Sequence, residues 1–210
     1  MENVHVVSNP FVADALTHLR DKTTATQEFR HFSDIICQIL IAESLKDVSM
    51  LPVTIETPLT TIKGQKLAEN VIVIPILRAG VAMLPSALTV FPKAKVGFIG
   101  LQRDEQTAIA KEYYWKMPHI TAEDIVLITD PMLATGGSTV HLLHKIAKKQ
   151  TKIVRVVCVI AAPEGIHAIQ KAFPNVHIIT AAVDDHLNDK KFIVPGLGDY
   201  GDRYFGTTEQ

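Results

Sequence analysis

One short segment combines residue types that could bind a charged sugar. It reads Asp130-Pro131-Met132-Leu133-Ala134-Thr135-Gly136-Gly137-Ser138-Thr139. Adjacent glycines let a backbone close around phosphate oxygens without a Cβ clash, and the hydroxyls beside them add hydrogen-bond donors. The acid can accept hydrogen bonds from sugar hydroxyls. The residue types and their spacing therefore indicate a ligand that carries both a phosphate and a ribose.

The elements on either side must position this segment. Residues 125–129 are apolar and mostly β-branched, which is typical of a strand buried on both faces. After the segment, Val140, Leu143 and Ile146 recur at helical spacing. The first N–H groups of a helix have no partner inside the helix and, together with the helix dipole, favour an anion. A strand, an acid, a glycine loop and a helix start thus predict a phosphate site.

The same loop also suits a plain helix cap, because Gly, Ser and Thr are common where helices begin. Two nucleotide-binding motifs are excluded. No lysine follows the glycines at the spacing of a Walker A loop, and Gly136-Gly137 does not give the GxGxxG pattern of dinucleotide sites. Taken alone, the loop leaves phosphate binding and helix capping open.

A basic residue follows each of two further predicted strands. Arg78 comes just after residues 70–76, and ligands gather at the C-terminal edges of parallel strands. Its planar guanidinium matches phosphate oxygens, although a surface arginine that holds a helix end fits the position equally. Arg103 follows the strand predicted at residues 95–101. The polar residues 105–113 suit either a hood that closes over the ligand or a plain exposed hairpin.

The order of predicted elements indicates an α/β fold. Strand-like runs alternate with turns and helical segments, which predicts a doubly wound, mainly parallel sheet in a single domain of residues 1–210. The predicted strands are residues 5–7, 53–59 with a continuation near 63–66, 70–76, 95–101, 113–115, 125–129, 153–161 and 176–181. One predicted helix starts at Asn9-Pro10, and further helical segments cover residues 27–45, 81–88, 140–147 and 166–173. A turn is predicted at residues 162–165, and a folded, glycine-rich loop at residues 192–207.

Composition narrows the class of protein. The chain has 210 residues, 47% of them hydrophobic and 20% charged, which suffices for one globular domain with a real core. A net charge of −1 argues against a nucleic-acid partner. Cys37 and Cys158 lie in apolar stretches and suit buried filling better than a metal site or a disulfide.

Arg78 within the apolar run 71–91 would cost roughly 2.5–3.5 kcal/mol in a membrane helix, and we recognise no signal peptide. We expect a soluble, cytoplasmic protein.

Two other polar groups deserve an interpretation. Asp184-Asp185 follows a predicted strand and could hold a metal, but it equally suits a solvated turn, which we favour. His141 and His144 share a helix face with no third ligand spaced to join them, so a solvated face is favoured over a metal site.

The glycine loop resembles the phosphoribosyl-diphosphate loop of the uracil phosphoribosyltransferase family. That family carries Asp-Pro where most phosphoribosyltransferases carry two adjacent acids. Three further segments agree with it in the same order: Pro75-Ile76-Leu77-Arg78-Ala79-Gly80, Ala161-Ala162-Pro163-Glu164-Gly165, and Pro195-Gly196-Leu197-Gly198-Asp199-Tyr200-Gly201-Asp202-Arg203. The resemblance runs from about Arg20-Asp21-Lys22 to the C-terminus.

The resemblance implies a phosphoribosyltransferase-like fold with a small hood and an N-terminal helical extension that helps form a homodimer or a higher homo-oligomer. The residues implied to bind 5-phospho-α-D-ribose 1-diphosphate (PRPP) are Arg78, Arg103, Asp130, Pro131, Met132, Leu133, Ala134, Thr135, Gly136, Gly137, Ser138 and Asp199. Those implied to bind uracil are Ile193, Gly198, Asp199 and Tyr200. Mg²⁺ is the implied cofactor, carried mainly by PRPP rather than by protein ligands. GTP, which activates some members, is the implied effector.

The implied reaction converts uracil and PRPP to UMP and diphosphate without a side-chain nucleophile, through positioning and charge stabilisation. Uracil offers an acceptor–donor–acceptor edge that backbone groups of the C-terminal loop can match. Cytosine would leave an N–H unpaired, at a cost of roughly 1–3 kcal/mol. Two rival functions are a phosphoribosyltransferase for another base and a non-enzymatic regulator that binds nucleotides and RNA.

Three departures from the family pattern bear on the hood and the base pocket. Gln102 stands where an aromatic residue is common, and residues 108–110 lack the usual leucine and proline. Tyr200 is bulkier than the alanine common in bacterial members. We expect these departures to affect hood closure and the tightness of the base pocket, not the diphosphate site.

Overall fold

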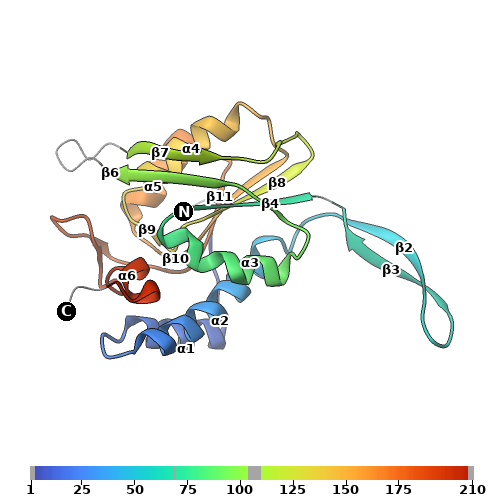
Figure 1. Cartoon of the computed structure of the whole chain (residues 1–210), viewed down its shortest axis with the longest axis horizontal. Helices are drawn as coiled ribbons and strands as arrows, with labels where there is room; N and C mark the ends of the chain where they lie inside the picture. Colours follow the sequence, from blue (N-terminus) through green and yellow to red (C-terminus); the bar gives the residue numbers. More distant parts are fainter. Residues whose placement is uncertain (1–2, 69, 104–109, 208–210) are drawn as a thin grey trace.

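A mainly parallel sheet forms the centre of the molecule (Figure 1). The computed structural model describes residues 3–68, 70–103 and 110–207. Within these ranges nine strands form the sheet, in the order β1-β11-β10-β8-β4-β6-β7, with β5 beside β4 and β9 beside β10. The strands are β1 (Val4–Val6), β4 (Asn70–Leu77), β5 (Lys95–Val96), β6 (Phe98–Arg103), β7 (Ala110–Lys116), β8 (Asp124–Thr129), β9 (Met132–Leu133), β10 (Ile153–Ala161) and β11 (His177–Val183). Among the described strand pairs of this sheet, only β6–β7 is antiparallel.

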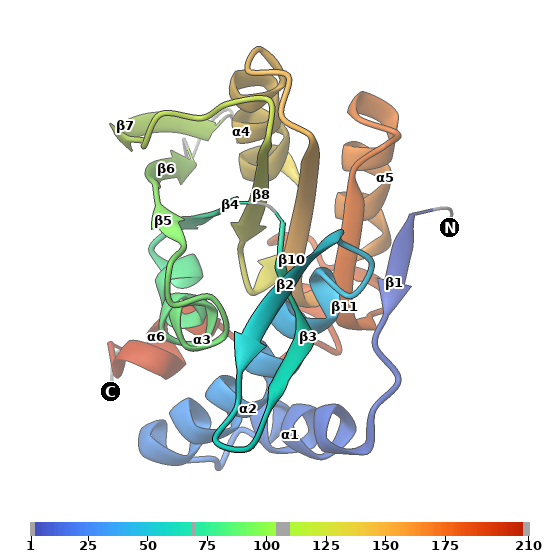
Figure 2. The ribbon, with the colours of Figure 1, turned by 90° about the vertical axis from the view of Figure 1, so that its right-hand side faces the viewer.

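Helices cover both faces of the sheet (Figure 2). They are α1 (Pro10–Arg20), α2 (Thr26–Ser44), the 3₁₀ turn η1 (Ala79–Met83), α3 (Leu84–Val90), α4 (Gly137–Ala147), α5 (Pro163–Ala172) and α6 (Tyr200–Phe205). The pair α4 and α5 packs on one face, and α1, α2 and α3 cover the other. The predicted doubly wound α/β fold is therefore confirmed.

The middle of the central strand β8 shows why residues 125–128 are all apolar. Ile125 and Leu127 point into the core under α2, whereas Val126 and Ile128 point into the core under α4 and α5. All four side chains are fully buried. Because both faces are covered, the strand has no polar alternation, and its C-terminal end delivers Asp130 to the edge of the sheet.

Most predicted elements lie where the sequence indicates, although several boundaries differ; the strand predicted at residues 95–101, for example, is divided into β5 and β6. The Asn9 side chain accepts a hydrogen bond from the N–H of Phe11 and caps α1, as Asn-Pro predicts. The turn predicted at residues 162–165 is instead the first turn of α5, since proline is well tolerated at the first helical position. The helix predicted at residues 81–88 is divided into η1 and α3.

Two antiparallel pairs lie outside the main sheet. The hairpin of β2 (Met50–Glu56) and β3 (Thr61–Leu67) projects from the body of the molecule (Figure 1). The short strand β12 (His186–Leu187) pairs with β13 (Ile193–Val194). The hairpin exposes six large apolar side chains: Met50, Leu51, Ile55, Leu59, Ile62 and Leu67.

The structure shows what surrounds the acid and the two histidines that the sequence analysis weighed as metal ligands. The solvated turn favoured for Asp184 was wrong, because its side chain is buried and ion-paired with Arg20. His141 lies 3.4 Å from a Glu112 oxygen, and the ring of His144 packs edge-on against Phe173. Among the described residues, no helix has the length and apolarity to cross a bilayer.

Candidate active site

The glycine loop leaves β8 and is tied at once to the neighbouring strand β10. The N–H of Asp130 donates to Val157 (3.2 Å), and the carbonyl of Pro131 accepts from Val159 (2.9 Å) and Ile160 (3.1 Å). Met132–Leu133 then forms the short strand β9 beside β10. The sequence predicted a loop over this whole stretch, so the strand corrects it. The added ladder holds the start of the loop rigidly against the sheet.

The loop ends where α4 begins, and its glycines set the turn. Gly136 has φ +75°, a conformation that favours glycine, and α4 starts at Gly137 without a side-chain N-cap hydrogen bond. The hollow above this helix start is lined by Asp130, Met132, Leu133, Ala134, Thr135, Gly136, Gly137, Ser138 and Thr139. Thus the predicted loop residues from Asp130 to Ser138, except Pro131, line one concave site at a helix N-terminus, where an anion is favoured.

Asp130 lines this hollow and is partly buried. Burial raises the pKa of its carboxyl to about 7, and the N–H of Met132, 3.5 Å from Oδ1, opposes that rise only weakly. A carboxyl in this state gains its charge readily when a ligand supplies hydrogen-bond donors. This is the property expected of an acid that receives ribose hydroxyls.

Gly165, in the first turn of α5, supports the loop from below, and sequence reasoning assigned it no role. A Cβ placed on Gly136 would lie 2.8 Å from the carbonyl oxygen of Gly165. A Cβ placed on Gly165 would overlap the carbonyl oxygen of Ala134 and lie 2.9 Å from that of Leu133. The loop and α5 therefore pack backbone against backbone. A glycine in the turn predicted at residues 162–165 was the signal available in the sequence.

Arg78 follows β4 at the same edge of the sheet. Its side chain is 65% exposed, and Nη2 lies 3.2 Å from Oδ1 of Asp202 in α6. Gly80 seats this turn against β8, because a Cβ there would overlap the carbonyl oxygen of Thr129. Arg103 ends β6, while its side chain and residues 104–109, where most of the hood is predicted, lie outside the described part of the chain.

The C-terminal segment completes the edge. Ile193 is buried in β13, and Gly198 has φ +81°. Asp199 caps α6 by accepting from the N–H of Asp202 at 2.8 Å. The prediction of a loop through residue 207 was wrong from Tyr200 onwards, because residues 200–205 form a short helix that packs against η1.

The bulk of Tyr200 is directed into the core. The residue is 1% exposed, and its hydroxyl donates to Oγ of Ser33 in α2 at 2.6 Å. Its ring meets Phe29 edge-on at 5.0 Å between centroids. Burial raises the pKa of the Tyr200 hydroxyl well above its ordinary value, so it remains a neutral donor. The larger side chain therefore anchors α6 to α2.

Removal of this hydroxyl gives a stability prediction. Tyr200→Phe leaves the buried Oγ of Ser33 without its donor, so the free energy of unfolding should fall by about 1–3 kcal/mol. Urea denaturation measures the change. Tyr114→Phe removes a hydroxyl from an exposed tyrosine of β7 and should change stability by less than about 0.5 kcal/mol. Equal stability of the wild type and Tyr200→Phe would contradict the anchoring role.

A single cavity of about 210 Å³ joins the three segments. It is lined by Ala79, Met132, Ala134, Lys190, Lys191, Phe192, Ile193, Gly198, Asp199, Tyr200 and Gly201. Met132 and Ala134 also line the hollow at the start of α4, called the phosphate hollow below, so the two spaces are adjacent. The described residues hold no group of three or more His, Cys, Asp or Glu side chains that could bind a metal ion by themselves.

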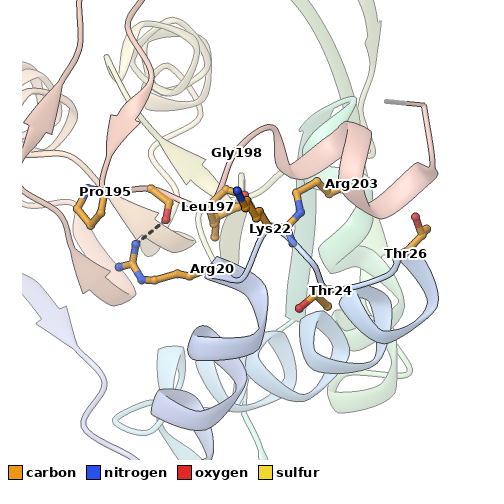
Figure 3. Close-up of a pocket in the computed structure, with 9 residues that line it drawn as sticks. Arg20, Lys22, Thr24, Thr26, Pro195, Leu197, Gly198 and Arg203 are labelled. Atoms are coloured by element: carbon orange, nitrogen blue, oxygen red, sulfur yellow. Dashed lines mark hydrogen bonds between the residues drawn. The ribbon is translucent and has the colours of Figure 1, made fainter. Parts of the chain in front are cut away.

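A second cavity, of about 340 Å³, lies behind the C-terminal loop (Figure 3). It is lined by Arg20, Lys22, Thr24, Thr26, Pro195, Gly196, Leu197, Gly198 and Arg203. Gly198 lines both this cavity and the cavity of about 210 Å³, so one loop separates them.

Comparisons with known proteins agree with this geometry. The family model described as uracil phosphoribosyltransferase matches residues 6–207. Proteins named uracil phosphoribosyltransferase from Anoxybacillus flavithermus (45% identity) and Campylobacter curvus (42% identity) each match over 99% of this chain and 100% of their own length.

Solved structures agree as well. The AQ2163 protein from Aquifex aeolicus aligns with a TM-score of 0.92 at 37% identity over 99% of this chain and 100% of its own. Adenine phosphoribosyltransferase from Trypanosoma brucei, at 11% identity and a TM-score of 0.57 over 91% of this chain and 87% of its own, shares the fold. On the match of the family model and the full-length relatives, the chain belongs to the uracil phosphoribosyltransferase family.

Proposed function

We propose that this chain joins uracil to the ribose of PRPP, with release of diphosphate and formation of UMP. The observation that carries the proposal is the adjacency of two spaces at one sheet edge: a phosphate hollow at a helix start and a base-sized cavity that shares Met132 and Ala134 with it. A phosphorylated sugar in the first would present its anomeric carbon to a base in the second.

The loop from Asp130 to Ser138 would hold the sugar phosphate. The N–H groups at the start of α4 and the hydroxyls of Thr135 and Ser138 would donate to the 5-phosphate. The Asp130 carboxylate would accept from the ribose hydroxyls. Pro131, Met132, Leu133, Ala134, Gly136 and Gly137 would shape the backbone around them.

The diphosphate would lie toward Arg78 and Arg103, which follow or end adjacent strands. Guanidinium groups pair well with phosphate oxygens. Asp130 is the one carboxylate among the residues that line the described hollow, which suits a Mg²⁺ ion that arrives with the phosphates and takes few protein ligands. Bound there, Mg²⁺ would neutralise charge on the departing diphosphate.

Uracil would bind against the main chain of Ile193, Gly198 and Tyr200, with Asp199 near the ribose. The positive φ of Gly198 turns its peptide groups in a direction that other residues rarely allow. Backbone donors and acceptors fixed in this way can match the acceptor–donor–acceptor edge of uracil. Catalysis would rest on this positioning and on charge stabilisation as the carbon–diphosphate bond breaks and the uracil nitrogen attacks.

Chromatography of a reaction that contains uracil, PRPP and Mg²⁺ tests the function. UMP and diphosphate should form in equal amounts and should stop forming when the metal is chelated. A purified, folded chain that forms no UMP would overturn the proposal.

Arg78→Ala gives a prediction for the diphosphate end. Because Arg78 is exposed at the site edge, its loss should leave the fold intact and remove charge-assisted hydrogen bonds of about 1.5–3 kcal/mol, so kcat/KM for PRPP should fall roughly 10-fold to 150-fold. Steady-state kinetics measure this. Lys93→Ala, which removes an exposed cation after α3, should leave kcat/KM unchanged. A wild-type value in Arg78→Ala would remove this arginine from the site.

GTP is proposed as an activator. The second cavity offers the exposed Lys22 and the partly buried Arg20 and Arg203, which suits an anionic ligand beside the base loop. Titration of UMP formation with GTP tests this, and an unchanged rate would contradict it.

A homodimer or a higher homo-oligomer is proposed on the basis of the β2–β3 hairpin. Its exposed apolar side chains, with Leu59 at 94% exposure, are a surface that association would cover. A light-scattering mass equal to one chain would contradict this proposal. A cytoplasmic location stays a prediction from the sequence.

A further inference from the structure

The loop that forms one side of the base cavity is fixed from behind by a buried ion pair. Arg20, the last residue of α1, meets Asp184, which follows β11, through two bonds: Nη1 to Oδ2 at 2.9 Å and Nη2 to Oδ1 at 2.5 Å. The Asp184 side chain is 3% exposed and that of Arg20 is 26% exposed. Such a two-pronged pair has a defined geometry as well as charge.

Both members of this pair also bind the same glycine. The N–H of Gly196 donates to Oδ2 of Asp184 at 2.9 Å, and the carbonyl of Gly196 accepts from Nη1 of Arg20 at 2.7 Å. Figure 3 shows the Arg20 side chain extending to the loop beside Pro195, with the bond to the carbonyl dashed. Gly196 has φ +63°, and a Cβ on it would overlap the carbonyl oxygen of Ile193. The peptide groups on both sides of this glycine are therefore held.

The next part of the loop is held by a second arginine. Arg203 of α6 donates to the carbonyl oxygens of Leu197 (2.7 Å) and Asp21 (2.6 Å), and also to that of Leu19. Gly196 and Leu197 of the loop are thus both tied, through these side chains, to the end of α1 and the residues just after it. The next residue, Gly198, lines the cavity proposed to bind the base.

On the basis of the proposed function, we propose that Arg20 and Asp184 are positioning residues for uracil: they fix the Gly196 peptides and thereby the backbone edge that reads the base. Neither residue lines the phosphate hollow or the base cavity. A loop released from this pair would have to be ordered by the base itself, and that ordering opposes binding. The 5-phosphate is held by a different loop, and Asp199 keeps its own bond from the N–H of Asp202, so binding of PRPP would be largely unaffected.

Kinetics of two variants test the inference. Asp184→Asn should raise KM for uracil by roughly 10-fold to 100-fold, while the Kd for PRPP, measured by calorimetry without uracil, stays within about twofold. Because one partner lost from a buried pair destabilises a fold, the double variant Arg20→Met, Asp184→Asn provides a second test without an unpaired buried charge, and the same split is expected. Asp185→Asn, at the exposed neighbouring acid, is the matched control and should behave as wild type.

Hydrogen exchange supplies a second readout. The Gly196 amide, whose N–H donates to Asp184, should exchange faster in both variants, and exchange of the β8 amides should not change. An unchanged uracil KM in both folded variants would overturn the inference while leaving the proposed function intact. An equal loss of uracil and PRPP affinity would also overturn it, because it would show general destabilisation. A wild type that forms no UMP would overturn the function and this inference together.

Discussion

Gly165→Ala is expected to lower the affinity for PRPP by roughly 100-fold or more, although the residue lies outside the phosphate hollow. The reason is steric, since a new Cβ would overlap the carbonyl oxygen of Ala134 and lie 2.9 Å from that of Leu133. Alanine favours a helix over glycine by about 1 kcal/mol. That gain cannot relieve an overlap with backbone, so the loop must move away from α5 and lose its shape around the phosphate.

Calorimetric titration with PRPP and Mg²⁺ measures the loss, and circular dichroism confirms that the variant is folded. His167→Ala is the matched control, because it introduces the same residue into α5 at an exposed position. It should bind PRPP as the wild type does. Full affinity in Gly165→Ala would show that the loop does not depend on its contact with α5.

PRPP binding should depend on pH through Asp130. Burial raises the pKa of this carboxyl to about 7 in the free protein, and the ribose hydroxyls favour its ionised form. Below about pH 7 the ligand must displace a proton, so affinity should fall by up to about tenfold for each unit of pH down to the pKa of the complex. Above about pH 7 this dependence should disappear.

Calorimetry in buffers with different heats of ionisation counts the protons released on binding. Asp130→Asn should bind PRPP more weakly and should lack the proton release assigned to this carboxyl. The comparison separates protons released by Asp130 from protons released by PRPP itself. Equal proton release in the variant and the wild type would contradict the assignment.

The same raised pKa has a consequence for the free protein. The pKa of the Asp130 carboxyl is about 7 in the folded chain, against the ordinary value of 3.8 in the unfolded chain, so the folded chain binds this proton more tightly. This contribution to stability is therefore present at low pH and is lost as the pH rises through about 7. Asp130→Asn should remove that part of the pH dependence.

The fold was predictable because its signals are local. Residues 125–128 are apolar in every position, which is what burial on both faces requires, and β8 contains them. Asn9-Pro10 marks the start of α1 by capping chemistry alone. The short strand β9 was missed because two residues carry no period, and their pairing depends on β10, which lies far along the chain.

The candidate site was predictable to the extent that its residues follow strand ends. Arg78 and Asp130 fall at the C-terminal edge of neighbouring strands, as a parallel sheet demands. What the sequence could not show is which distant groups support them. Asp184 looks like a solvated acid beside Asp185, and only the fold brings Arg20 to it. The direction of the Tyr200 side chain likewise depends on where α2 packs.

The most direct test of the central claim compares kcat/KM for uracil, cytosine, hypoxanthine and orotate at saturating PRPP and Mg²⁺. Uracil should be preferred, and cytosine should be slower by roughly 10-fold or more because its amino group leaves a backbone donor unpaired. Equal turnover of cytosine or faster turnover of a purine would contradict the account of the base cavity. No turnover with any base, together with RNA binding, would contradict the enzyme itself.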